Sequence, residues 1–420
     1  MRPRDLSVRV AFISPSGRGN LGDAAIITSL IAGIRRRHPD AEIVGFTLSP
    51  EGTTREHGVP ALRLNGFKVP SYAPAPADDP FPGASLLARI GPLRRPVRWA
   101  SIAAGDRGFR QQALARIRGF DLVVVSGGGQ LDDLFGGPLG QPYTLWSWSG
   151  LARQAGARFV ILSVGTGRLS KPLSRSLIRR ALAAASYRSF RDRKSLALVA
   201  GMAPADDPIV PDLAYAVPLS AEPERAPSQP PTVGVSPMAF ADPRSWPEED
   251  AARYARHIDS VSALVTRMVR AGHPVVLFTS DSPDRLAVDD LLARVHGTLD
   301  AAERARIRVP EIGGLADLLR VLREVDLVVA ARLHGVMLSH IVGRPVLAIS
   351  HERKVATLMA DMHHEQFCFA IDAFDAEAGW QRFVQLVERR AELAADVREK
   401  VAGFRARVEA QYDQIFGGTR

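Results

Sequence analysis

Short apolar runs alternate with longer stretches of helical periodicity along most of the chain. Residues 8–13 (VRVAFI) form the first run, and residues 23–36 follow with an apolar face of Ile26, Ile27, Leu30, Ile31 and Ile34. This spacing predicts an amphipathic helix, whereas short β-branched runs predict buried strands. Further runs predict strands at residues 42–46, 121–126 and 158–163. The alternation predicts an α/β domain with a parallel sheet flanked by helices.

The same alternation restarts after a segment that is dense in proline, serine and charge. Residues 217–232 (VPLSAEPERAPSQPPT) are of the kind that joins domains. The elements predicted beyond them are strands at 232–236, 274–279, 326–330 and 345–349 and helices at 249–271, 315–324 and 335–342. The proline- and alanine-rich residues 69–96 predict a loop or flap. We therefore predict four parts: an N-terminal Rossmann-like domain (1–218), a linker (219–231), a C-terminal Rossmann-like domain (232–375) and a helical tail (376–420).

Composition is that of an ordinary globular protein long enough for two domains. The chain has 420 residues, of which 46% are hydrophobic and 24% charged. Its formal net charge is +9, and only five of its 54 basic residues are lysine. A general preference for arginine is the simplest explanation. The arginines lack the interleaved aromatic residues of a nucleic-acid interface, so we expect no nucleic acid as a partner. Weak attraction to an anionic membrane surface stays open.

The cysteine content and the apolar runs bear on where the protein works. Cys368 is the only cysteine, which rules out an internal disulfide and fits a reducing compartment. Its neighbours Phe367 and Phe369 favour a buried structural thiol over a nucleophile. We find no secretory signal pattern and no run of 18 apolar residues. We expect a cytoplasmic protein, with peripheral attachment to the inner face of the membrane left open.

Three glycine-rich segments follow predicted strands of the first half. In the first, Gly19 and Asn20 precede Asp23, which is placed to cap the predicted helix. The start of that helix offers N–H groups to an anion, but a plain capped turn explains the segment about as well. It has neither the spacing of a dinucleotide-binding loop nor the lysine of a P-loop. The triplet Gly127, Gly128 and Gly129 favours the wall of a ligand crevice over a tight packing turn, and Gly165 and Gly167 are expected to line the same crevice.

Cationic side chains follow three other predicted strands. Arg332 and His334 stand between a buried strand and a helix, and two residues of extended chain would point both toward one ligand. Arginine offers a planar charged fork for carboxylate or phosphate, and histidine can donate a proton near neutral pH. Arg191 could contact an anion or form an exposed ion pair with Asp192, and the sequence favours neither. Lys354 could be a second anion contact or part of a solvated run of charges.

Two acidic or histidine-rich clusters raise the question of a metal site. His363, His364 and Glu365 form one, and Asp132 with Asp133 forms the other. Neither has the spacing of a zinc or EF-hand site, so surface polarity is the better explanation. We expect no metal and no cofactor.

Taken in order, these motifs resemble those of the polysaccharide pyruvyl transferase family. The matching segments are residues 19–23 (GNLGD), 127–129 (GGG), 165–167 (GTG), 189–192 (SFRD), 332–334 (RLH), 343–345 (GRP) and Lys354. The resemblance covers roughly residues 8–360. It implies two Rossmann-like domains that face a central cleft, as in GT-B glycosyltransferases, and phosphoenolpyruvate as the donor.

The resemblance also implies roles for particular residues. Arg332 and His334 match donor-binding and catalytic residues, Arg191 matches a donor contact, and Lys354 is a further anion contact. The glycine-rich segments are assigned to the cleft and to a glycan acceptor, with a lipid-linked acceptor left open. Two rival functions remain: a glycosyltransferase that uses nucleotide sugars, and a non-catalytic protein of polysaccharide assembly.

Overall fold

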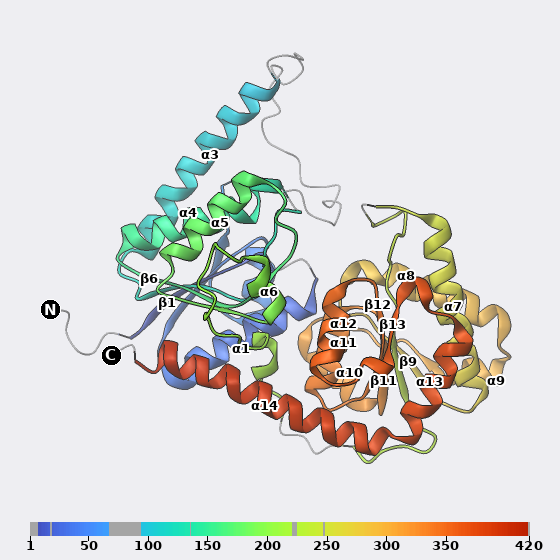
Figure 1. The fold of residues 1–420 in the computed structure, drawn as a ribbon. Coiled ribbons are helices and arrows are strands. Elements are labelled where there is room, and N and C mark those ends of the chain that lie inside the picture. The colour runs from blue at the N-terminus through green and yellow to red at the C-terminus, as the bar shows by residue number, and fades with distance from the viewer. Residues whose placement is uncertain are drawn as a thin grey trace. The chain divides into compact units, whose positions relative to one another are not determined.

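The computed structural model describes residues 7–16, 19–66, 94–134, 136–220, 225–246 and 248–418. Residues 69–93 of the predicted loop lie outside this set, and Arg94 begins a helix. The chain divides into two compact units. The first comprises Met1–Arg18, Ile26–Val217 and Arg407–Arg420, and the second comprises Gly19–Ala25 and Pro218–Ala406. Each unit is built on one sheet (Figure 1).

The sheet of the first unit has the strand order β3-β2-β1-β4-β6-β5, and β7 pairs with β6. Its strands, all paired in parallel, are β1 (Arg9–Ser14), β2 (Glu42–Thr47), β3 (Ala61–Arg63), β4 (Leu122–Val125), β5 (Gly128–Leu131), β6 (Arg158–Thr166) and β7 (Tyr187–Phe190). The helices are α1 (Leu21–Arg37), α2 (Pro50–His57), α3 (Arg94–Ile117), α4 (Gln141–Ala155), α5 (Pro172–Ala184) and α6 (Arg193–Leu198).

The sheet of the second unit has the order β10-β9-β8-β11-β12-β13, again with parallel pairs. Its strands are β8 (Val233–Ser236), β9 (Val275–Leu277), β10 (Ile307–Arg308), β11 (Leu327–Ala330), β12 (Val346–Ser350) and β13 (Cys368–Ala370). The helices are α7 (Ala251–Arg270), α8 (Arg285–Thr298), α9 (Ala301–Arg304), α10 (Leu315–Glu324), α11 (Leu333–Ile341), α12 (Arg353–Asp361) and α13 (Ala376–Glu388). Helix α14 (Arg390–Phe416) follows.

Continuous apolar runs explain why these strands form the cores. Every residue of β4 and of β11 is buried, as expected for strands covered by helices on both faces. In the first unit Trp148 of α4 packs on Phe46 of β2, with ring centroids 4.4 Å apart, and its indole N–H donates to the carbonyl of Leu64. The predicted α/β class with two parallel sheets is confirmed.

The linker and the C-terminal helix are held by specific polar contacts. Within the predicted linker, the amide of Ser228 donates to Asp326, which also accepts from the amide of Thr232. In the first unit, Tyr412 of α14 makes a 3.0 Å hydrogen bond with Ser29 of α1. Polar groups therefore fix both segments to their units.

Candidate functional site

The best-supported site lies at the carboxyl edge of the second sheet, where β11 leads into α11. In doubly wound sheets ligands bind beyond the carboxyl ends of strands, where the strand order reverses. Here the order reverses between β8 and β11, and Arg332 stands two residues after the end of β11. Arg332 has extended backbone (φ −84°, ψ 140°) as the N-cap of α11. The site therefore occupies the position at which this fold class binds ligands.

The guanidinium of Arg332 is held by two aspartates. Its Nε and Nη2 donate to the two carboxylate oxygens of the buried Asp284 at 2.7 and 2.9 Å. Its Nη1 lies 3.7 Å from the carboxylate of Asp281, and the guanidinium carbon lies 5.6 Å from the ring centroid of Trp246. Asp284 also accepts from the amide of Ala239. A bidentate carboxylate fixes the orientation of a guanidinium, so Arg332 is held in one pose.

The electrostatics of this group follow from its burial. Burial by itself lowers the pKa of Arg332, but Asp284 and Asp281 raise it, so the guanidinium keeps its charge. Burial raises the pKa of Asp281 to about 6, although Arg332 opposes the shift. Sequence reasoning missed both aspartates. They stand in the segment that follows the strand predicted at 274–279, so the rule that identified Arg332 could have found them.

The glycine-rich segment at Gly19 pairs with the segment that carries Asp281. The amide of Leu21 donates to the carbonyl of Ser280 at 3.0 Å, and the amide of Ser282 donates to the carbonyl of Gly19 at 3.3 Å. An antiparallel bridge joins Asn20 to Asp281. The structure therefore brings the first predicted motif next to the partners of Arg332, within the second unit.

Gly22 in this segment lies directly against the imidazole of His334. A β-carbon added at Gly22 would lie only 1.8 Å from Cγ and 2.1 Å from Nδ1 of that ring. Real side chains do not approach so closely, so only glycine allows the ring its position. The sequence motifs at residues 19–23 and 332–334 are thus parts of one site.

Two details of the predicted site are wrong. Asn20, not Asp23, caps α1: its side-chain oxygen accepts from the amides of Gly22 and Asp23 at 3.0 and 3.1 Å. With Leu21 bonded to Ser280, this capping occupies the N–H groups that were expected to bind an anion. Helix α11 begins at Leu333, so His334 lies in its first turn and the argument from extended chain does not apply.

Lys354 follows the neighbouring strand, β12. Its Nζ lies 3.4 Å from Glu352, and its side chain is 37% exposed. His351, beside it, packs edge-on against Trp246, with ring centroids 6.0 Å apart. Burial lowers the pKa of His351 to about 4, so this imidazole is neutral at physiological pH. Lys354 thus presents a partly exposed, ion-paired cation near the sheet edge that carries Arg332.

The glycine triplet and the second glycine pair lie in the first unit. Gly128 and Gly129 belong to strand β5, while Gly127 precedes it with φ +84°, a conformation that favours glycine. Gly129 is exposed, with nothing within 4 Å of an added β-carbon. At Gly167 the absent side chain leaves room for the carboxylate of Asp132.

Arg191 follows β7 in the first unit and is almost fully buried. Its Nη1 lies 3.5 Å from Asp212 and its Nε 3.3 Å from Asp192, and its side chain is only 8% exposed. A β-carbon added at Gly165 would lie 2.7 Å from the guanidinium carbon, so Gly165 makes room for this side chain. The pairing is a buried one, not the exposed ion pair considered from the sequence. A site shared by Arg191 and Arg332 stays a prediction.

The other predicted polar clusters have structural partners. Asp133 accepts from the amides of Ser170 and Lys171, and it is buried, so its role is not surface polarity. His364 pairs with Asp396 at 2.8 Å. Among the described residues, no three His, Cys, Asp or Glu side chains gather as metal ligands would.

Cys368 is half-buried, and burial raises the pKa of its thiol to about 11. The thiolate is the reactive form, so this cysteine is a poor nucleophile. None of the helices in the described ranges combines the length and the apolar character that a bilayer span needs.

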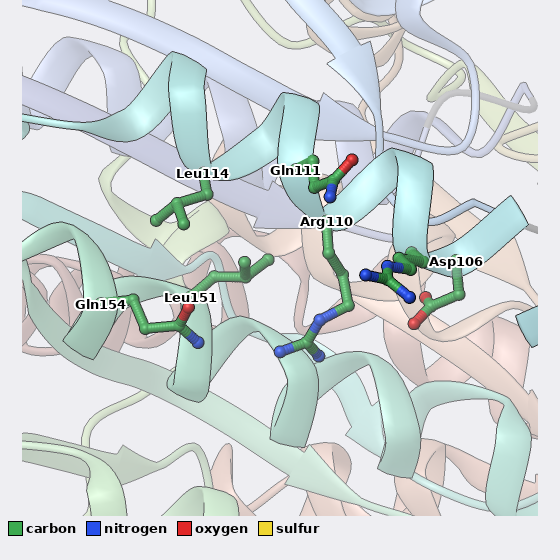
Figure 2. Close-up of a pocket in the computed structure, with 7 residues that line it drawn as sticks. Asp106, Arg110, Gln111, Leu114, Leu151 and Gln154 are labelled. Carbon is green, nitrogen blue, oxygen red and sulfur yellow. The ribbon is translucent and has the colours of Figure 1, made fainter. Parts of the chain in front are cut away.

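Two shallow hollows lie away from these motifs. One, of about 270 Å³, lies between α3 and α4, and Figure 2 shows Arg110 extending from α3 toward the helix that carries Leu151 and Gln154. Arg110 donates to Ser147 of α4 at 2.6 Å, so this side chain ties the two helices together. The other, of about 290 Å³, lies beside α7 and is lined in part by His257 and by Arg253, which pairs with Asp372. Neither hollow contains a residue predicted from the motifs.

Comparison with solved structures shows the fold class. UDP-GlcNAc 2-epimerase from Neisseria meningitidis, bound to UDP-GlcNAc, aligns with a TM-score of 0.58 at 11% identity, over 98% of this chain and 100% of that one. The glycosyltransferase SnogD from Streptomyces nogalater aligns with a TM-score of 0.55 at 16% identity, over 98% and 99%. These are GT-B enzymes, and at such identities the likeness shows the fold alone. No curated protein matches the chain.

Comparison with protein families shows the family. The family model of polysaccharide pyruvyl transferase matches residues 20–353, which is most of the chain. The matched region begins at Asn20 and ends just after the strand that precedes Lys354. It includes both segments that meet at the Gly22–His334 contact. The chain belongs to the polysaccharide pyruvyl transferase family.

Proposed function

We propose that this transferase moves the pyruvyl group of phosphoenolpyruvate onto a pair of hydroxyls of a polysaccharide or its precursor, forming a cyclic ketal. The observation that carries the proposal is that Arg332 and His334 both lie at the start of α11. Asp284 fixes the guanidinium of Arg332, and Gly22 leaves room for the imidazole of His334. A fixed cation and an imidazole suit a small, highly anionic donor.

The imidazole of His334 acts first as an acid. It gives a proton to the methylene carbon of the donor, which becomes a methyl group and leaves the central carbon electrophilic. A sugar hydroxyl attacks that carbon and returns its proton to the imidazole. The bond between the central carbon and the phosphate oxygen then breaks. The second hydroxyl closes the ring, and its proton leaves with phosphate, so protons balance over the cycle.

Arg332 orients the donor and stabilises its charge. Two of its nitrogens are engaged by Asp284, so its remaining face, through Nη1, is the part that meets the donor. That face is shared with Asp281, whose carboxylate competes with an anion when it is ionised. Lys354, in the first turn of α12 beyond the neighbouring strand β12, supplies a further charge, and Arg191 of the first unit is proposed as an additional donor contact. The chemistry asks for no cofactor.

The deciding experiment is incubation with phosphoenolpyruvate and candidate glycans, with phosphate release and the mass of the added ketal as readouts. His334→Ala is expected to abolish both, while His296→Ala on α8, outside the site, leaves them unchanged. Near-normal turnover in His334→Ala would overturn the assignment of the acid. Thermal stabilisation by nucleotide sugars without phosphate release would favour a glycosyltransferase, as would be natural for this fold. We expect a cytoplasmic reaction, and a lipid-linked acceptor is open to the same assay.

A further inference from the structure

Two serine hydroxyls at the site have no hydrogen-bond partner among the described residues. They belong to Ser236, the last residue of β8, and to Ser280, which follows β9. Ser236 is 2% exposed and Ser280 is 1% exposed. An unpaired buried hydroxyl is costly, and most such groups in proteins do have a partner. Two of them side by side therefore point to a missing partner.

Both hydroxyls face one residue, Gly335, in the first turn of α11. A β-carbon added at Gly335 would lie 3.5 Å from the hydroxyl oxygen of Ser280 and 3.7 Å from that of Ser236. These are ordinary contact distances, so a methyl group fits there without a clash. The missing side chain thus leaves a recess bounded by Gly335 and the two hydroxyls, which we call the serine recess.

The start of α11 adds backbone donors beside the serine recess. No side chain caps this helix, and no described residue accepts from the amides of Leu333 or Gly335. Helix α11 has nine residues, and its first turn carries the partial positive charge of the helix dipole. Unoccupied amides at such a helix start favour an anion.

We infer that the serine recess binds an oxygen of the donor's phosphate group, through the hydroxyls of Ser236 and Ser280 and the first-turn amides of α11. This inference rests on the proposed function. The Asp284 carboxylate offsets much of the charge of the Arg332 guanidinium, so uncharged donors must supply much of the hold on the phosphate. Hydroxyls and amides at a helix start are donors of that kind.

The test is titration of the full chain with inorganic phosphate, phosphoenolpyruvate and pyruvate, followed by calorimetry. We expect Ser236→Ala and Ser280→Ala each to weaken the binding of phosphate and of phosphoenolpyruvate about tenfold or more, as the loss of one hydrogen bond to an anion does. Pyruvate, which has a carboxylate but no phosphate, is expected to bind the variants and the wild type alike. The matched control is Ser262→Ala on α7, which deletes another buried hydroxyl that lacks a partner among the described residues.

Gly335→Ala separates binding from folding. Its methyl group fills the serine recess, so we expect phosphate binding to fall at least tenfold. Because alanine is the better helix former, the thermal midpoint is expected to stay the same or to rise. Gly297→Ala on α8, where an added β-carbon meets nothing within 4 Å, controls for the change in helix propensity.

Several outcomes would overturn the inference. These are absence of phosphate binding by the wild type, unchanged phosphate binding in the three recess variants, and losses confined to pyruvate. If the serine variants lose stability but keep phosphate affinity, an ordered water fills the recess and the inference is wrong. The proposed function can fail separately. If the wild type binds phosphate as expected but transfers no pyruvyl group, the inference about the serine recess holds and the proposed reaction is refuted.

Discussion

The contact between Gly22 and His334 allows a sharp test of how the imidazole is positioned. In Gly22→Ala the new β-carbon would lie 1.8 to 2.2 Å from three ring atoms. Carbon atoms pack at about 3.5 Å or more, so the ring must retreat by roughly 1.5 Å. A displacement of about 1 Å at a reacting group can cost about 100-fold in rate. We therefore expect turnover to fall about 100-fold or more.

Folding should survive this change. Gly22 has no positive φ, so alanine can adopt its backbone conformation, and alanine in a helix gains up to about 1 kcal/mol over glycine. The assay is phosphate release at saturating phosphoenolpyruvate, with circular dichroism to check the fold. Gly403→Ala in α14, where an added β-carbon meets nothing within 4 Å, is the matched control and should keep full turnover.

A double-variant cycle makes the test specific to the imidazole. Because His334→Ala is expected to abolish turnover, the cycle is read in the free energy of unfolding. In the His334→Ala background the clash with the ring is gone, so any loss of stability that Gly22→Ala causes in the wild type should disappear. Wild-type turnover in the Gly22→Ala single variant would refute the reasoning. So would additive losses of stability in the double variant, because they would mean that Gly22 acts on the site by another route.

Three further changes test the polar contacts around the two arginines. Asp284→Asn leaves Arg332 buried without its main partner, so the free energy of unfolding measured with urea should fall by about 3 to 5 kcal/mol. The double variant with Arg332→Met should regain most of this loss. A loss below about 1 kcal/mol would contradict the pairing. Because burial raises the pKa of Asp281 to about 6, ionisation of Asp281 destabilises the fold as the pH rises from about 4 through 6. Asp281→Asn should therefore stabilise by about 2 to 3 kcal/mol at pH 7.5 and by little near pH 4 in the same assay, and a gain independent of pH would refute this. Gly165→Ala pushes on the guanidinium of Arg191 and should destabilise by about 1 to 3 kcal/mol in thermal unfolding, which Arg191→Ala in the same chain should relieve.

The sequence predicted the parts of the fold that depend on local pattern. The helix predicted at 315–324 is α10 (Leu315–Glu324), and the run at 326–330 contains β11 (Leu327–Ala330). Apolar periodicity and continuous apolar runs are strong signals because burial imposes them on every residue of an element. The predicted boundaries of helices were less accurate, since α1 and α11 each begin two residues before the predicted position. At these ends polar side chains and isolated amides, not periodicity, decide the boundary.

The candidate site was predicted only in part. Arg332 and His334 were singled out because a charged fork and an imidazole at a strand end are chemically distinctive. Ser236 and Ser280 gave no such signal, because short polar residues at and after strand ends are common in turns. The approach of Gly22 to His334 joins distant parts of the chain, and no local pattern encodes that pairing.

The hydrogen bonds between Gly19, Leu21 and the Ser280–Ser282 turn have a consequence for how this protein can be divided. A fragment that begins at Pro218 carries β8 to β13 but lacks the residues that seat His334. The complementary fragment carries Gly22 without the imidazole that it serves. The same holds during synthesis on the ribosome, because residues 19–22 cannot form these hydrogen bonds until the Ser280–Ser282 turn has been synthesised. We therefore expect halves severed at the proline-rich junction to be inert alone, and to regain turnover only when mixed and reassembled.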